Sequence, residues 1–154
     1  MRRAGPVAAA CAAVLGLGAL AGCGSSGSAA ASPARISVSN AYIPLPASPT
    51  MAVAYFDIGN SGGSADRLLN VSSPAVQSAA LNQSTATSMQ TVDGVDVPAH
   101  GAAHLARGGT HVMLMGLGPS LRIGQRIQLT LTFRNSGAVT VEATVQPLTY
   151  QPPG

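Results

Sequence analysis

A histidine and two methionines occupy alternate positions in residues 110–117 (THVMLMGL). If this stretch is a β-strand, His111, Met113 and Met115 point to one face of it and the residues between them point to the other. Two interpretations follow. In the first, the methionines fill the core and His111 lies at an edge. In the second, an imidazole and thioethers gather to hold a soft metal ion, Cu(I) above all, because thioether sulfur is a poor ligand for Zn²⁺ or Ca²⁺.

The start of the chain predicts where the protein is located. A short basic head, Met1-Arg2-Arg3, precedes an apolar run over residues 7–20, and Leu20-Ala21-Gly22-Cys23 closes the segment. This pattern is typical of a lipoprotein signal peptide over residues 1–22, with Cys23 as the lipidated first residue of the mature chain. The apolar run is shorter than the roughly 20 residues of a transmembrane helix. We therefore expect an exported protein, anchored by lipid to the outer face of the cytoplasmic membrane.

Three further segments follow the predicted signal peptide. Residues 23–34 are rich in Ser, Gly and Ala, which predicts a flexible tether. Residues 35–146 are long enough for one domain with a hydrophobic core. Residues 147–154 contain three prolines and are expected to be a disordered tail.

Cysteine content and charge exclude several classes of function. Cys11 leaves with the signal peptide and Cys23 carries lipid, so no thiol remains for a disulfide, a nucleophile or a blue-copper site. Without Arg2 and Arg3, the mature chain has six basic and five acidic residues, which offers no basic patch for nucleic acid. The acids are scattered, and neither a nucleophile-elbow sequence nor a phosphate-binding glycine loop is present. We therefore expect that the protein is not an enzyme.

Hydrophobic residues along the domain alternate with polar ones, and turn residues interrupt them. This period of two predicts short β-strands, and no window has a sustained helical pattern. The expected strands are 35–43, 51–58, 66–71, 77–82, 87–92, 102–106, 110–117, 127–133 and 138–146. The predicted fold is all-β, an antiparallel Greek-key β-sandwich.

Four stretches of the sequence resemble a known family. AYFDIGNSGGSADRLLNVSSPA (54–75), MQTVDGVDVPA (89–99), THVMLMGL (110–117) and GQRIQLTLTF (124–133) are similar to the periplasmic copper chaperones of the PCu(A)C family. The resemblance implies a cupredoxin-like β-sandwich that binds Cu(I) through a histidine, a methionine and a His-x-Met pair. It also implies a role in supplying copper to cytochrome oxidase, alongside Sco-type copper proteins.

The resemblance assigns three of the four copper ligands. In the family pattern twenty-one residues separate the first methionine from the His-x-Met pair, and the same spacing here selects Met89, His111 and Met113. The first histidine of the family usually follows a leucine, and in SSPAVQSAALN that position is Asn82. An asparagine amide has little affinity for Cu(I). Three soft ligands remain.

Several other residues are candidates to replace the missing histidine. A two-residue hairpin turn at Gly108-Gly109 would place His104 beside Met113, whereas the alternative is that His104 is a solvated surface residue. Met115 and Met51 are further candidate sulfur ligands, or else ordinary packing residues. Two hypotheses result: an extracytoplasmic Cu(I) carrier that uses Met89, His111 and Met113, or a lipoprotein of the same fold that has lost metal binding and serves in interaction or structure.

Overall fold

The structure of the protein is a computed structural model that describes residues 29–154. These residues form strands and no helix, and they include no helix that could cross a membrane. The predicted signal peptide and Cys23 lie outside the described residues. The strands are β1 (Ile36–Pro44), β2 (Met51–Asn60), β3 (Asp66–Ser72), β4 (Ser78–Ser84), β5 (Met89–Thr91), β6 (Val95–Val97), β7 (Gly101–Leu105), β8 (Thr110–Met115), β9 (Arg126–Phe133) and β10 (Gly137–Gln146).

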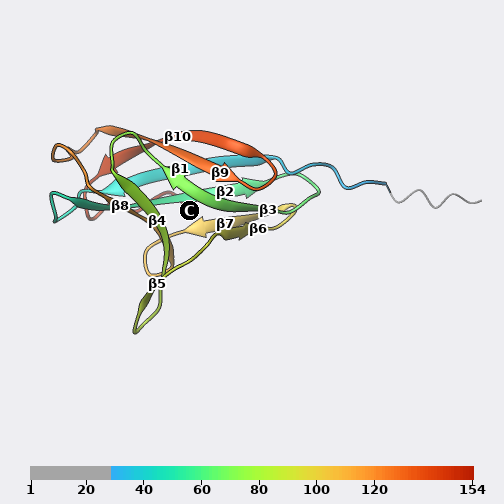
Figure 1. Cartoon of the computed structure of the whole chain (residues 1–154), viewed down its shortest axis with the longest axis horizontal. Helices are drawn as coiled ribbons and strands as arrows, with labels where there is room; N and C mark the ends of the chain where they lie inside the picture. Colours follow the sequence, from blue (N-terminus) through green and yellow to red (C-terminus); the bar gives the residue numbers. More distant parts are fainter. Residues whose placement is uncertain (1–28) are drawn as a thin grey trace, which may run out of the picture.

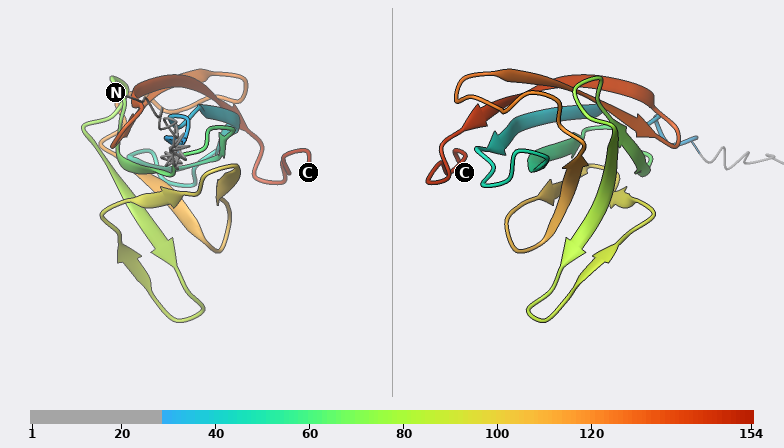
Figure 2. Two further views of the ribbon diagram at one scale, coloured as in Figure 1. Left: turned by 90° about the vertical axis from the view of Figure 1, so that its right-hand side faces the viewer. Right: turned by 60° about the vertical axis from the view of Figure 1, so that its left-hand side comes forward.

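The strands join into one sheet that curls around the core. Their order is β5-β4-β8-β2-β1-β10-β9-β3-β6, with β7 also paired to β2. The sheet curls so that β3 contacts β4 and β6 contacts β7, while the β4–β5 hairpin projects from the body (Figures 1 and 2). All pairings are antiparallel except β1 with β10, which is parallel. The predicted all-β fold is therefore confirmed, but the sheet is mixed rather than purely antiparallel.

The core is built from the inner faces of the long strands. In β2 every second side chain from Ala52 onward is buried, and in β9 the four apolar residues Ile127, Leu129, Leu131 and Phe133 are buried while their polar neighbours are not. This is the alternation expected for a sheet with one face on the core. Period-two patterning thus decides which side chains remain on the outer face.

Each of the nine strands expected from the sequence has a counterpart, within a few residues at the ends. The strand that the sequence did not predict is β6, three residues within DGVDVPA. Its surroundings contain Asp, Gly and Pro, which are typical of turns. It forms because Val97 is fully buried and because β6 pairs with the edge of β3.

Of the two alternatives for residues 104–113, the hairpin between β7 and β8 does not form. A turn does form at residues 106–109, where the Gly109 amide donates to the Ala106 carbonyl and Gly108 has a positive φ of 78°. The chain does not fold back after it. Both β7 and β8 run antiparallel to β2, and they pair with successive halves of it. The ten-residue β2 offers an edge long enough for both strands, and this arrangement buries Leu105 and Val112 completely or nearly so.

Both ends of the domain pack more closely than the sequence predicts. The end of the expected tether contacts the turn after β2, where the Gly63 amide donates to the Ser32 hydroxyl and the Ser64 hydroxyl donates to the Ser32 carbonyl. At the other end, a disordered tail is expected over residues 147–154. Instead, Tyr150 packs edge-on against Tyr42 at 5.0 Å between ring centroids. Aromatic packing and backbone hydrogen bonds compensate the cost of ordering both segments.

Candidate metal centre

Strand β8 separates its core residues from its candidate ligands. Val112 and Leu114 are fully buried on the inner face, whereas Met113 and Met115 are half-buried on the outer face. The interpretation of these two methionines as core residues is therefore wrong. His111 belongs to the same outer face, yet it is only 4% exposed. Other side chains on that face must cover the imidazole.

The covering residues of His111 lie on the two neighbouring strands. On one side Asn82 of β4 is the direct cross-strand partner of His111. On the other side the ring of Tyr55, from β2, lies 6.4 Å from the imidazole between centroids. Burial raises the pKa of the Tyr55 hydroxyl, while Arg107 opposes and Tyr42 adds to this effect. Tyr55 therefore stays neutral at physiological pH and adds no charge beside His111.

One backbone contact fixes the orientation of the imidazole. His111 Nδ1 lies 3.1 Å from the Gly109 carbonyl oxygen. A carbonyl oxygen can only accept a hydrogen bond, so Nδ1 must carry the proton. In the neutral imidazole this leaves the lone pair on Nε2, which makes no hydrogen bond within residues 29–154. Such a backbone contact is the usual way in which proteins fix a metal-binding histidine.

Asn82 occupies the place where the family resemblance expects a histidine. Its side chain is buried, and its amide oxygen accepts a hydrogen bond of 2.9 Å from the Thr91 hydroxyl of β5. Because Asn82 directly opposes His111, a ligand at this position would lie beside the imidazole. The resemblance predicts a metal ligand at position 82, and the asparagine there does not supply a soft donor atom.

The structure does not bring Met89 next to the other candidates. Met89 is 54% exposed on β5 and pairs with Ser84 of β4, so it shares the outer face with Asn82 and His111. However, β4 lies between β5 and β8. Ordinary sheet spacings place the Met89 Cα about 12 Å from that of His111 and about 16 Å from that of Met113. Met89 is thus held on the projecting hairpin (Figure 1), apart from the His-x-Met pair.

His104 lies away from the methionines. It pairs with Asp57 of β2, and its Nδ1 lies 2.7 Å from the Asp57 carboxylate. The Asp57 carboxylate also accepts a hydrogen bond from Asn40. Burial alone would raise the pKa of Asp57, but the contacts with Asn40 and His104 outweigh it and lower the pKa below its usual value. The His104 side chain is 67% exposed, so the alternative of a surface residue agrees with the structure and the position beside Met113 does not.

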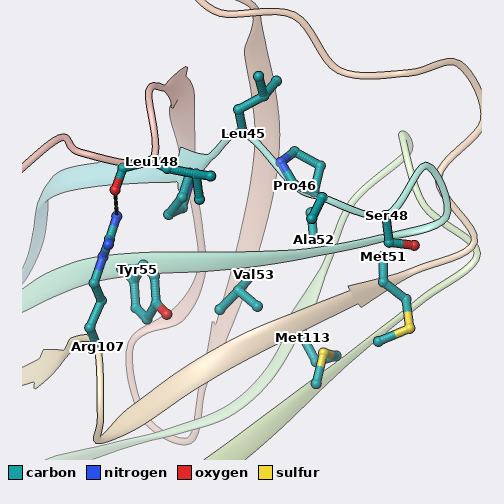
Figure 3. A pocket seen from close by; sticks show the side chains of 12 residues that line it. Leu45, Pro46, Ser48, Met51, Ala52, Val53, Tyr55, Arg107, Met113 and Leu148 are labelled. Atoms are coloured by element: carbon teal, nitrogen blue, oxygen red, sulfur yellow. Dashed lines mark hydrogen bonds between the residues drawn. The ribbon is translucent and has the colours of Figure 1, made fainter.

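An apolar groove is bordered by two of the methionines, Met51 and Met113. Met51 at the start of β2 is 44% exposed and pairs directly with Met115. Met51 and Met113 both line a cavity of about 540 Å³, and Figure 3 shows their side chains turned toward each other. On its other side, Arg107 donates a 2.7 Å hydrogen bond to the Leu148 carbonyl, which ties the C-terminal segment to the groove. Within residues 29–154, no three His, Cys, Asp or Glu side chains are grouped to hold a metal.

Sequence reasoning did not identify the residues that surround the ligands. Tyr55 and Arg107 have no chemical motif around them, and the Gly109 carbonyl is a backbone group. Their roles depend on the pairing of β2 with β8. The one available signal was the alternation in MAVAYFDI (51–58), which places Tyr55 on the same face as Met51.

Comparisons with known structures agree with the fold. The copper-bound PCuAC domain from PmoF2 has a TM-score of 0.64 and 27% identity, covering 75% of this chain and 95% of that domain. The solution structure of CuI-DR1885 from Deinococcus radiodurans has a TM-score of 0.61 and 28% identity, covering 79% of this chain and 83% of the other. The protein is thus a cupredoxin-like β-domain of the PCuAC type.

Sequence comparison places it more narrowly. The family described as "Putative lipoprotein LpqE-like" matches residues 36–145, and the chain belongs to this LpqE-like family. "Putative lipoprotein Lxx21020" of Leifsonia xyli subsp. xyli is 33% identical over 116 residues, which cover 72% of this chain and 69% of that protein. The predicted resemblance to lipoprotein forms of the copper chaperone family is confirmed.

Proposed function

We propose that the protein is an extracytoplasmic carrier of Cu(I), which binds the ion through His111 and Met113. The single observation that carries this proposal is the arrangement of these two side chains. They are neighbours on the outer face of β8, and the Gly109 carbonyl leaves His111 Nε2 as the donor atom. An imidazole and a thioether are soft neutral ligands, which suit Cu(I) better than harder cations.

Met89 is the proposed third ligand. Its distance from β8 means that the projecting β4–β5 hairpin must move toward His111 for the thioether to reach the ion. The hairpin suits such motion, because β5 is only three residues long and each of them is exposed. A ligand that closes on the ion and opens again would allow its release to a partner.

The ligand set fits a carrier better than a catalyst or a permanent metal site. It contains no thiolate, so the bound ion is held without the strength of a cysteine sulfur. Transfer would proceed by ligand exchange, with a ligand of the recipient replacing one thioether at a time. The family resemblance suggests a cytochrome c oxidase subunit or a Sco-type copper protein as the recipient.

Lipidation at Cys23 would keep this exchange at a membrane. The family of lipoproteins to which the chain belongs supports an exported and anchored protein. We place the domain on the outer face of the cytoplasmic membrane. There, a tethered carrier meets membrane proteins at a raised effective concentration.

A second candidate function is an interaction or structural lipoprotein without metal. Two observations favour it. Asn82 replaces a soft ligand and is engaged by Thr91, and Met89 lies about 12 Å from His111 by sheet spacing. In this case the His111–Met113 pair would be a remnant of a copper site.

A competition titration with Cu(I) against a chromophoric chelator distinguishes the two functions. The carrier is expected to bind one ion, and His111→Ala or Met113→Leu should weaken binding by at least about 10-fold. His104→Ala is the matched control, since it also removes one imidazole but lies beside Asp57, and it should leave the affinity unchanged. A native protein that fails to compete with the chelator would favour the metal-free lipoprotein.

A further inference from the structure

Every methionine within residues 29–154 lies on the outer face of the sheet. Met51 and Met115 are direct cross-strand partners, and Met113 is the next residue of β8 on that face. Met89 shares the face through the pairings of β4 with β5 and β8. Methionine is ordinarily a core residue. Its placement outside the core in all four cases calls for a role other than packing.

Three of these methionines are close enough to bind one ion. Directly opposed residues have Cβ atoms about 5 Å apart, and diagonal neighbours such as Met51 and Met113 are about 7 Å apart. Met113 and Met115 are two positions apart along one strand, which is also about 7 Å. Methionine has three rotatable side-chain bonds, so the three sulfurs can converge on a common point. Figure 3 shows Met51 and Met113 already turned toward each other.

The side chains around this triangle neither block it nor compete with it. On β4 the cross-strand neighbours of Met115 and Met113 are Ser78 and Ala80, which are small. On β2 the neighbour of Met113 is Val53. None of these carries a charge, so the triangle offers thioether sulfur as its main donor. Such a set favours Cu(I) over Zn²⁺, Mg²⁺ or Ca²⁺.

We propose that Met51, Met113 and Met115 form a second soft-metal site, made of thioethers alone, which shares Met113 with the site at His111. This inference rests on the proposed function, because it assigns a second position to the same cargo. Sharing Met113 means that one ion occupies either position, and it passes between them by exchanging His111 for the sulfurs of Met51 and Met115. Met51 lines the apolar groove and is 44% exposed, so this second position is where a partner can reach the ion.

Ag(I) titration followed by NMR of methionine methyl groups tests the second site. Ag(I) is a redox-stable analogue of Cu(I), and the methyl signals of the purified protein are assigned from single Met→Leu variants. At one equivalent of Ag(I) the signals of Met51, Met113 and Met115 should all shift. In Met51→Leu the shift of Met115 should be lost. Leu69→Ala is the matched control, because it shortens an apolar side chain that is 39% exposed, close to the 44% of Met51, on β3, which pairs with neither β2 nor β8, and it should leave these shifts unchanged.

Two results would overturn the second site, and the chelator titration separates them. If Cu(I) binds but the Met51 and Met115 signals stay fixed at saturating Ag(I), the all-thioether site is absent and the proposed carrier stands. If no methyl signal moves and Cu(I) does not bind, both proposals fail. Met51→Leu conserves volume at an exposed position, so loss of folding would not confuse the outcome.

Discussion

The Asp66 carboxylate connects two parts of the chain that are distant in sequence, the start of β3 and the β9–β10 turn. It is only 4% exposed. Its two oxygens accept hydrogen bonds from the backbone amides of Arg67, Asn135 and Ser136 and from the Ser136 hydroxyl. Through these bonds it attaches the β9–β10 turn to the start of β3. Asp66→Ala would leave all four donors without their acceptor.

The expected cost follows from the number and exposure of these donors. A hydrogen bond to a charged group contributes about 1.5–3 kcal/mol, but water can reach the exposed turn at Asn135 and replace part of the network. We therefore expect Asp66→Ala to lower the free energy of unfolding by about 3 kcal/mol. For a domain of this size that is a decrease in Tm of about 12 °C. Asp66→Asn keeps one acceptor and should lose about half as much.

The pH dependence gives a second test of the same network. Burial alone would raise the pKa of Asp66, but the hydrogen bonds from Ser136, Asn135 and Arg67 outweigh it and hold the pKa below its ordinary value. A lowered pKa stabilises the fold above the unfolded value of about 3.9, and this contribution is lost as the pH falls through the folded pKa.

Chemical denaturation between neutral and acidic pH measures both effects. The stabilities of native protein and Asp66→Asn should converge as the pH falls below about 4. Asp93→Ala, which removes a 94% exposed carboxylate, should leave the Tm unchanged. Equal stability of the native protein and Asp66→Ala at pH 7, or a difference in stability that does not depend on pH, would contradict the stabilising role of the ionised Asp66 carboxylate.

Two further variants test the ligand gap and the packing of the N-terminal segment. Asn82→His places a second imidazole opposite His111, and it should raise Cu(I) affinity by at least about 10-fold in the chelator titration; an unchanged affinity would mean that position 82 does not face the ion. Gly62→Ala would put a Cβ 2.1 Å from the Pro33 carbonyl oxygen, so the N-terminal segment around Pro33 must move away. The Arg35 amide, which donates a hydrogen bond to Asn60, should then exchange faster with deuterium. Gly118→Ala is its control, because a Cβ there meets nothing within 4 Å, and equal exchange in the two variants would contradict the contact.

Much of the fold could be predicted because it depends on local patterning. The alternation in IQLTLTF (127–133) is enough to identify β9 and its buried face. The separation of Met113 from Val112 across β8 follows from the same period of two. These features depend only on side-chain direction within one strand.

Features that depend on pairing between distant strands could not be predicted. The Gly108-Gly109 sequence is typical of a hairpin turn, but β2 is long enough to pair with both β7 and β8. His104 therefore does not lie beside Met113. The distance of Met89 from His111 likewise depends on β4 lying between them. Sequence spacing identifies the same residues whether they are adjacent or two strands apart.

X-ray absorption at the copper edge of the protein loaded with one equivalent of Cu(I) tests directly whether His111 and Met113 hold the ion. We expect a coordination shell dominated by sulfur with an imidazole contribution. That contribution should disappear in His111→Ala and persist in His104→Ala. A shell of oxygen and nitrogen without sulfur, or a spectrum that His111→Ala does not change, would contradict the claim that His111 and Met113 hold the ion.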